Sequence, residues 1–167
     1  MTAPDILQEI VHYQKPNLTI VEYDGCLVFI MRSALSVEDV REMARIRREM
    51  DRRWASGLVT LTLLEENSAL PGLDVQKAAI AELSHMKVAG VAVVTMSQGF
   101  LASAVRSIVT SIFRLKKGTW PVVLFDDVPE ATAWCATRVK RPATWGFRLG
   151  RVIDRCRRYQ VKESPHE

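Results

Sequence analysis

The stretch 91–138 constrains the fold more than any other part of the chain. It contains two apolar runs rich in β-branched residues, VAVVTM and PVVLF, with an amphipathic helical pattern between them and a second helical pattern after them. Two buried strands joined by a crossover helix form a parallel pair. The stretch therefore predicts an α/β fold with a largely parallel sheet.

The residues before this stretch predict an antiparallel start to the sheet. LTIVEY (18–23) and CLVFIMR (26–32) are strand-like runs separated by Asp24 and Gly25, a pair typical of the tight turn of a β-hairpin. The preceding ILQEIV favours a short helix that ends before Pro16.

Helices and strands then alternate along the chain. A helix beginning at Ser36 leads to the strand LVTLTLL (58–64), and a helix beginning at Asp74 leads into the stretch described above. A last, basic helix is expected over 145–160. The predicted order is β-β-α-β-α-β-α-β-α followed by this helix, with the helices packed on a mixed, mostly parallel sheet with right-handed crossovers.

Length and charge divide the chain into three parts. A chain of 167 residues suits one domain with a sizeable core. Residues 138–167 contain nine Lys and Arg against three acidic residues, so the net charge of +4 is concentrated there. We expect an N-terminal segment (1–16), an α/β domain (17–139), and a basic C-terminal helix and tail (140–167).

Composition favours a cytoplasmic protein. The cysteines, Cys26, Cys135 and Cys156, are scattered and odd in number, which suits a reducing compartment better than a disulfide framework. No apolar run reaches the roughly 20 residues of a membrane-spanning helix. The first residues, MTAPDILQEI, lack the pattern of a secretory signal.

No motif predicts an enzyme, a cofactor or a metal site. The three histidines are far apart, and the sequence contains neither CxxC nor a glycine-rich nucleotide-binding pattern. Cys135 has no histidine near it and is interpreted as a buried structural thiol. Acidic pairs at 65–66 and 126–127 follow strands at the same expected sheet edge. We interpret them as helix caps and turn residues, with an acidic cluster for Mg²⁺ or a basic partner as the alternative.

The helix expected over 99–117 is apolar around more than one narrow face. Such a helix is either deeply buried or has apolar surface left for a partner. Core packing is the first interpretation, a homodimer interface is the second, and lipid contact is the third. The candidate interaction surface consists of Phe100, Val105, Ile108, Val109, Ile112 and Phe113.

The last helix is basic and amphipathic, with Leu149, Val152 and Ile153 on its apolar face. The favoured interpretation is that it docks on its own domain or on a dimer mate. The alternatives are an acidic protein partner first, then an anionic membrane surface, and nucleic acid last. The candidate contacts are Arg148, Arg151, Arg155, Arg157 and Arg158.

The element order, with a hairpin first and helices after it, resembles the STAS fold, and one local motif narrows the resemblance. The motif runs from a strand ending in Phe through an acidic turn into a helix that begins Glu-Ala and ends with Trp, and it comprises Phe125, Asp126, Asp127, Glu130, Ala131 and Trp134. It resembles the stand-alone bacterial STAS-like proteins related to anti-sigma-factor antagonists. The resemblance implies regulation through protein contacts and a phosphoacceptor at the start of the helix after the third strand. The corresponding candidate is Ser68, which carries the only hydroxyl in its loop. Without the resemblance, the loop sequence favours a turn or capping role for Ser68.

We therefore expect a non-catalytic regulatory or scaffolding protein that acts through protein–protein contacts and self-associates. The alternative is a small module that binds an apolar ligand or lipid through the 99–117 helix and the basic tail.

Overall fold

The computed structural model describes residues 8–83, 85–115 and 119–158 as an α/β fold built on one mixed sheet. Within these residues the six strands, in their order across the sheet, are β1 (Ile10–Gln14), β2 (Leu18–Tyr23), β3 (Cys26–Met31), β4 (Leu58–Leu64), β5 (Val88–Thr95) and β6 (Val122–Phe125). The five helices are α1 (Val37–Arg53), α2 (Leu73–Leu83), α3 (Gly99–Arg114), α4 (Val128–Arg138) and α5 (Ala143–Arg158). The predicted α/β class is confirmed.

The hairpin of β2 and β3 follows from its two turn residues. Both Asp24 and Gly25 have positive φ, at 38° and 85°, and Tyr23 pairs with Cys26 across the turn. Two-residue turns of this kind match the twist of the strands, and they require positive φ, which glycine adopts without strain. From β3 to β6 the strands pair in parallel. The sheet is therefore antiparallel on one side and parallel on the other, as the sequence predicts.

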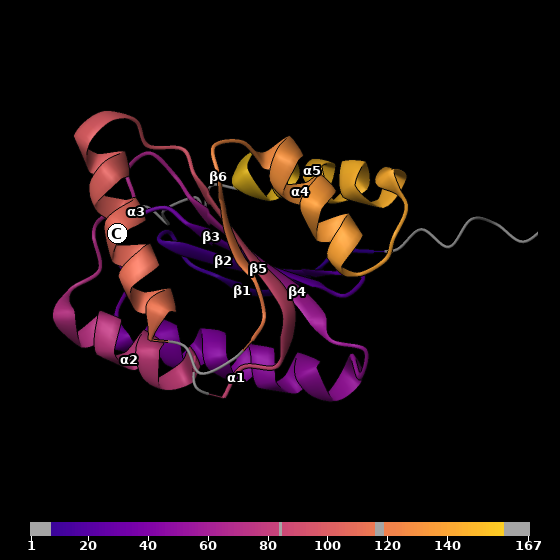
Figure 1. The fold of residues 1–167 in the computed structure, drawn as a ribbon, viewed down its shortest axis with the longest axis horizontal. Coiled ribbons are helices and arrows are strands. Elements are labelled where there is room, and N and C mark those ends of the chain that lie inside the picture. The colour runs from indigo at the N-terminus through magenta and orange to yellow at the C-terminus, as the bar shows by residue number, and fades with distance from the viewer. Residues whose placement is uncertain (1–7, 84, 116–118, 159–167) are drawn as a thin grey trace, which may run out of the picture.

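The helices form two layers, one on each face of the sheet (Figure 1). Strands β3 to β6 are parallel neighbours in chain order, and the three crossovers between them place α1, α2 and α3 on the same face. The helices α4 and α5 follow β6 and cover the opposite face. On that face Cys135 and Leu149 join Val28 and Leu61 in a fully buried core.

The N-terminal segment adds a strand that the sequence does not predict. The short helix expected over ILQEIV is wrong for all of its described residues: Gln8 and Glu9 are not helical, and Ile10 and Val11 begin β1. Residues 6 and 7 lie outside the described part of the chain. β1 pairs antiparallel with the outer edge of β2. This pairing satisfies backbone groups that an isolated short helix would leave to water, and it brings His12 Nε2 to 2.7 Å from Oε2 of the buried Glu22.

The basic helix α5 packs on its own sheet, as the docking interpretation predicts. Its apolar residues Leu149, Val152, Ile153 and Cys156 are all buried in the core shared with α4. Within the described residues, therefore, both the N-terminal segment and the C-terminal helix pack against the 17–139 domain. The proposed boundaries at 16 and 140 stay a prediction.

A capping box holds the start of α1. The hydroxyl of Ser36 accepts a hydrogen bond from Asp39 N, and Asp39 Oδ2 accepts one from Ser36 N at 2.8 Å. The buried Asp39 carboxylate also accepts hydrogen bonds from Tyr13 Oη and Asn17 Nδ2. Burial by itself raises the pKa of Asp39. The bonds from Ser36, Asn17 and Tyr13 outweigh burial, so the pKa of Asp39 lies below its ordinary value.

Candidate ligand-binding cavity

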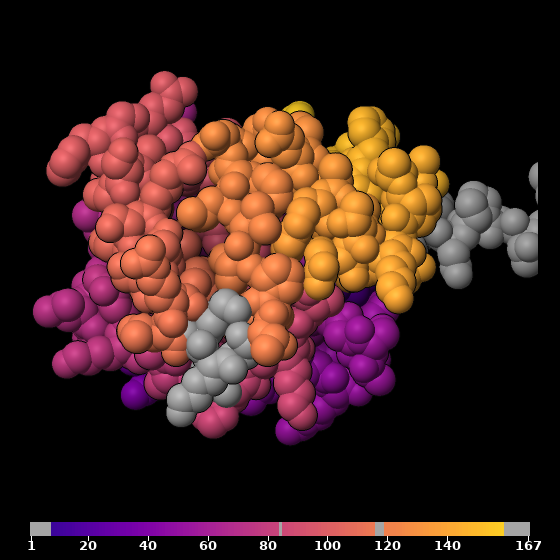
Figure 2. All heavy atoms as spheres, viewed as in Figure 1, coloured from indigo at the N-terminus to yellow at the C-terminus, as the bar shows by residue number. Residues whose placement is uncertain are grey.

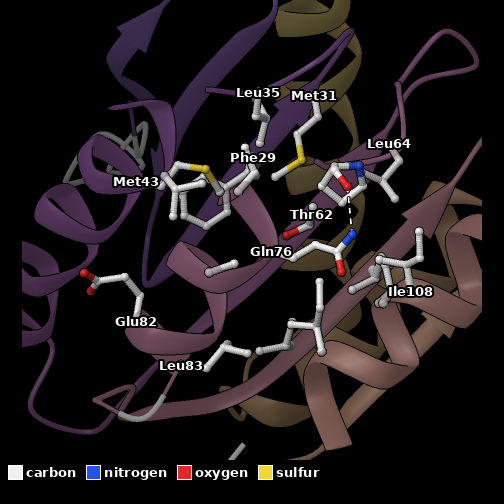
Figure 3. A pocket seen from close by; sticks show the side chains of 18 of the residues that line it. Phe29, Met31, Leu35, Met43, Thr62, Leu64, Gln76, Glu82, Leu83 and Ile108 are labelled. Atoms are coloured by element: carbon white, nitrogen blue, oxygen red, sulfur yellow. Dashed lines mark hydrogen bonds between the residues drawn. The ribbon is translucent and has the colours of Figure 1, made fainter. Parts of the chain in front are cut away.

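An apolar cavity of about 220 Å³ lies between the sheet and the layer of α1, α2 and α3. Strands β3, β4 and β5 form its floor, the three helices form its walls, and the loop between β4 and α2 lines one end (Figure 3). Side chains that point into it in Figure 3 include Phe29, Met31, Thr62, Leu64, Met43, Gln76, Leu83 and Ile108. Almost all of this lining is apolar.

Two features of the helices leave this space open. The inward positions Ala44 of α1 and Ala79 of α2 carry only a methyl group and reach a short way toward the sheet. In addition, α3 buries only Ala102 and Val105 among its sixteen residues. Since interiors otherwise pack without voids larger than a water molecule, an opening of this size is a feature to be explained.

The candidate interaction surface on α3 is divided between the cavity and the exterior. Val105, Ile108, Val109, Ile112 and Phe113 all line the cavity, and apart from the buried Val105 they are half-buried. The sixth predicted residue, Phe100, does not line the cavity. It lies in the first turn of α3, and its side chain is 90% exposed.

Few polar groups interrupt the apolar lining. Gln76 Nε2 donates to Pro71 O at 2.8 Å, and Ser68 Oγ donates to Met31 O at 2.7 Å. Thr62 of β4 also contributes to the wall, and Figure 3 places it beside Gln76.

Two charged residues border the cavity, and each pairs with a partner on a helix. Arg47 Nη1 lies 3.1 Å from Asp51 Oδ2, and Glu82 Oε2 lies 2.7 Å from Arg48 Nη1. Burial lowers the pKa of Arg47 and raises the pKa of Asp51. The other terminal nitrogen of Arg47, Nη2, is buried without a hydrogen-bond partner among the described residues, and it has almost no accessible surface. A ligand atom in the cavity therefore meets no accessible unpaired charge at Arg47.

Ser68, the candidate phosphoacceptor, is buried, with 4% of its surface exposed. Its hydroxyl is committed to the carbonyl of Met31 and fastens the 65–72 loop to the end of β3. This hydrogen bond agrees with the turn or capping role that the loop sequence favours for Ser68. A kinase would reach the hydroxyl only after the loop moved, and phosphorylation of Ser68 stays a prediction.

The arginines of α5 divide into two groups. Arg155 pairs with Glu9, and Arg157 binds both carboxylate oxygens of Glu65 at 2.6 and 2.9 Å. The other three candidates, Arg148, Arg151 and Arg158, are exposed. The pair of Arg157 with Glu65 connects α5 to the loop that lines one end of the cavity.

The acidic pairs after β4 and β6 have local roles. Glu65 binds Arg157, and Arg106 of α3 pairs with Asp126. Asp127 caps α4, where it accepts a hydrogen bond from Glu130 N at 2.8 Å. Within the described part of the chain, no group of three or more His, Cys, Asp or Glu side chains is placed to hold a metal ion.

The described cysteines are buried thiols, including Cys135, as predicted. Burial and the neighbouring Cys135 raise the pKa of Cys26 well above its usual range. Across residues 8–83, 85–115 and 119–158, no helix combines the length and apolar character needed to cross a membrane.

Comparison with known proteins yields no relative: no family model matches the chain, and no curated protein is significantly similar to it.

Five of the six residues predicted as an interaction surface on α3 line the cavity, but the sequence predicted none of its other walls. The walls from α1 and α2 include Ala44, Gln76 and Ala79, and the floor consists of strand residues that the sequence assigned to the core. The one signal available in the sequence was the alanine at inward helical positions, which predicts a short reach toward the sheet.

Proposed function

We propose that this protein is a non-catalytic, cytoplasmic binding module that holds a small apolar ligand between the sheet and α1–α3. The observation that supports this most is the apolar cavity of about 220 Å³ beneath α3. Preformed, mostly apolar pockets with a few polar groups are the usual form of small-molecule sites. Ligand binding was the alternative function expected from the apolar helix over 99–117, and the cavity beneath α3 is the site proposed for it.

The size of the cavity limits the ligand. A dry apolar cavity of roughly 150 Å³ holds benzene. The same packing places roughly nine carbon-sized atoms in 220 Å³. The part of a ligand that the cavity can hold is therefore about the size of a fused two-ring hydrocarbon or a short chain.

Titration with indene, a two-ring hydrocarbon, tests the proposal. Chemical shifts of backbone amides should move at residues around the cavity, with a dissociation constant on the order of 0.1–1 mM for so small a ligand. The variant Ala79→Leu fills part of the cavity and should lose this response. Ala81→Leu, an identical change at an exposed position of α2, should retain it. Indene that leaves the cavity amides unmoved in the wild-type protein would refute the proposal.

A second proposed function, regulation through self-association, is supported by a separate observation. Phe100 and Leu73 are 90% and 75% exposed, at the N-terminal ends of α3 and α2. Helix α3 lies at the surface on the left of Figure 2. Large exposed apolar side chains are typical of contact surfaces. The STAS-like resemblance supports the same role, with the exposed arginines of α5 available for an acidic partner.

Light scattering after gel filtration tests this second function. The wild-type protein should form a dimer, and Phe100→Ser should shift it toward monomer. Phe147→Ser removes a similarly exposed ring, at 70%, from α5 on the opposite layer and should leave the dimer unchanged. A wild-type protein that stays monomeric at high concentration contradicts self-association and leaves the ligand proposal standing.

A further inference from the structure

The polar groups of the cavity narrow the class of ligand. Resting on the proposed function, we infer that the ligand is a neutral, largely apolar molecule of about nine non-hydrogen atoms with one hydrogen-bond donor. The acceptor for that donor is Gln76 Oε1.

The orientation of the Gln76 amide follows from its neighbour. Pro71 O is a carbonyl oxygen and can only accept, so the group that faces it at 2.8 Å is the Nε2 amide nitrogen. The oxygen Oε1 is therefore on the other side of the amide. Figure 3 shows the carboxamide between Thr62 and Ile108, with the hydrogen bond from Nε2 dashed.

Oε1 has an unused capacity to accept. No described residue donates a hydrogen bond to it, although a carboxamide oxygen has two lone pairs. Apart from Thr62 beside it, the cavity lining that Gln76 shares is mostly apolar and includes Val105 and Ile108 of α3 and Val75 of α2. A donor on the ligand would complete the hydrogen bonding of this half-buried group, and an apolar environment strengthens such a bond.

The charged residues argue against an ionic ligand. Arg47 is held by Asp51, and its second nitrogen is covered, while Glu82 is held by Arg48. An anionic ligand would lose its hydration and find no accessible cation at Arg47, and a cationic ligand would have to compete with Arg48 for Glu82, so both are unfavourable. Neutral ligands avoid this cost.

Indole and indene form a matched pair for the test, since they share the two-ring shape and only indole carries an N–H donor. Calorimetric titration of the wild-type protein should show indole binding roughly fivefold tighter than indene, the effect of one net hydrogen bond. In Gln76→Met the order should reverse, because a buried N–H without an acceptor loses its water. The control Gln14→Met makes the same change at an exposed position of β1 and should keep the wild-type ratio.

The outcomes separate the two ideas. Indene that binds as tightly as indole in the wild-type protein overturns the donor inference and leaves apolar binding intact. Failure of both molecules to bind overturns the proposed function and this inference together. The wild-type comparison needs no variant, so it holds even if Gln76→Met unfolds.

Discussion

Leucine in place of Ala79 should stabilise the protein without ligand, because the added carbons enter existing space. Ala79 lines the cavity from α2, and the cavity volume of about 220 Å³ exceeds the roughly 75 Å³ that three added carbons occupy at the density of benzene in a 150 Å³ cavity. Burying roughly three methylene equivalents contributes about 2.4 kcal/mol.

One correction reduces that value. Ordering a leucine side chain costs about 0.5–1 kcal/mol of rotamer entropy. The net gain in the free energy of unfolding is therefore about 1.5 kcal/mol. For a chain of this length it corresponds to a rise in Tm of about 5 °C.

Urea and thermal unfolding of Ala79→Leu and Ala81→Leu measure this effect. Ala81 is on the exposed side of α2, so leucine there should change the free energy of unfolding by less than about 0.5 kcal/mol. If Ala79→Leu instead destabilised the protein by about 1–3 kcal/mol, the site would be fully packed and leucine would overpack it. That result would remove the physical basis of the cavity and of the ligand proposed for it.

The capping carboxylate of α1 supports two further predictions. Asp39→Ala should lower the free energy of unfolding by about 3 kcal/mol, since it removes the carboxylate half of the capping box and leaves three part-buried donors, on Ser36, Tyr13 and Asn17, without this acceptor. Asp127→Ala, which removes a single exposed cap bond from α4, should cost about 1 kcal/mol, and equal costs in urea unfolding would contradict this account. The pKa of Asp39 is lowered in the folded state, so its stabilisation is present above the unfolded pKa of about 4 and is lost as pH falls through the folded value. The stability difference between wild type and Asp39→Ala should therefore shrink on acidification below about pH 4, and a constant difference would count against the assignment.

Local chemistry made much of the fold predictable. Asp24 and Gly25 adopt the positive φ values that their pairing in a hairpin turn implies. Ser36 and Asp127 cap the helices that begin beside them, as their side-chain oxygens favour. The β-branched runs became parallel strands, mostly buried in β5 but half-buried in β6, which lies at the edge of the sheet. For the turn and the two caps, the deciding interactions lie within a few residues of one another along the chain.

The N-terminal strand shows where local reasoning fails. Residues 10–14 have a weak local preference, and they become β1 because β2 offers a free edge and Glu22 offers a partner for His12. A pairing partner that is distant in sequence overrides a weak local tendency.

The cavity is the clearest case of a property decided by tertiary structure. The sequence by itself determined that the 99–117 helix has more apolar surface than one core stripe requires, and that the basic helix has an apolar face to dock. It did not determine that Ala44, Ala79 and the half-buried face of α3 would surround one space above Thr62. Empty volume depends on how far side chains from separate elements reach toward each other, and close packing makes differences of one methyl group count. The spacing between these side chains is set only when the helices pack on the sheet.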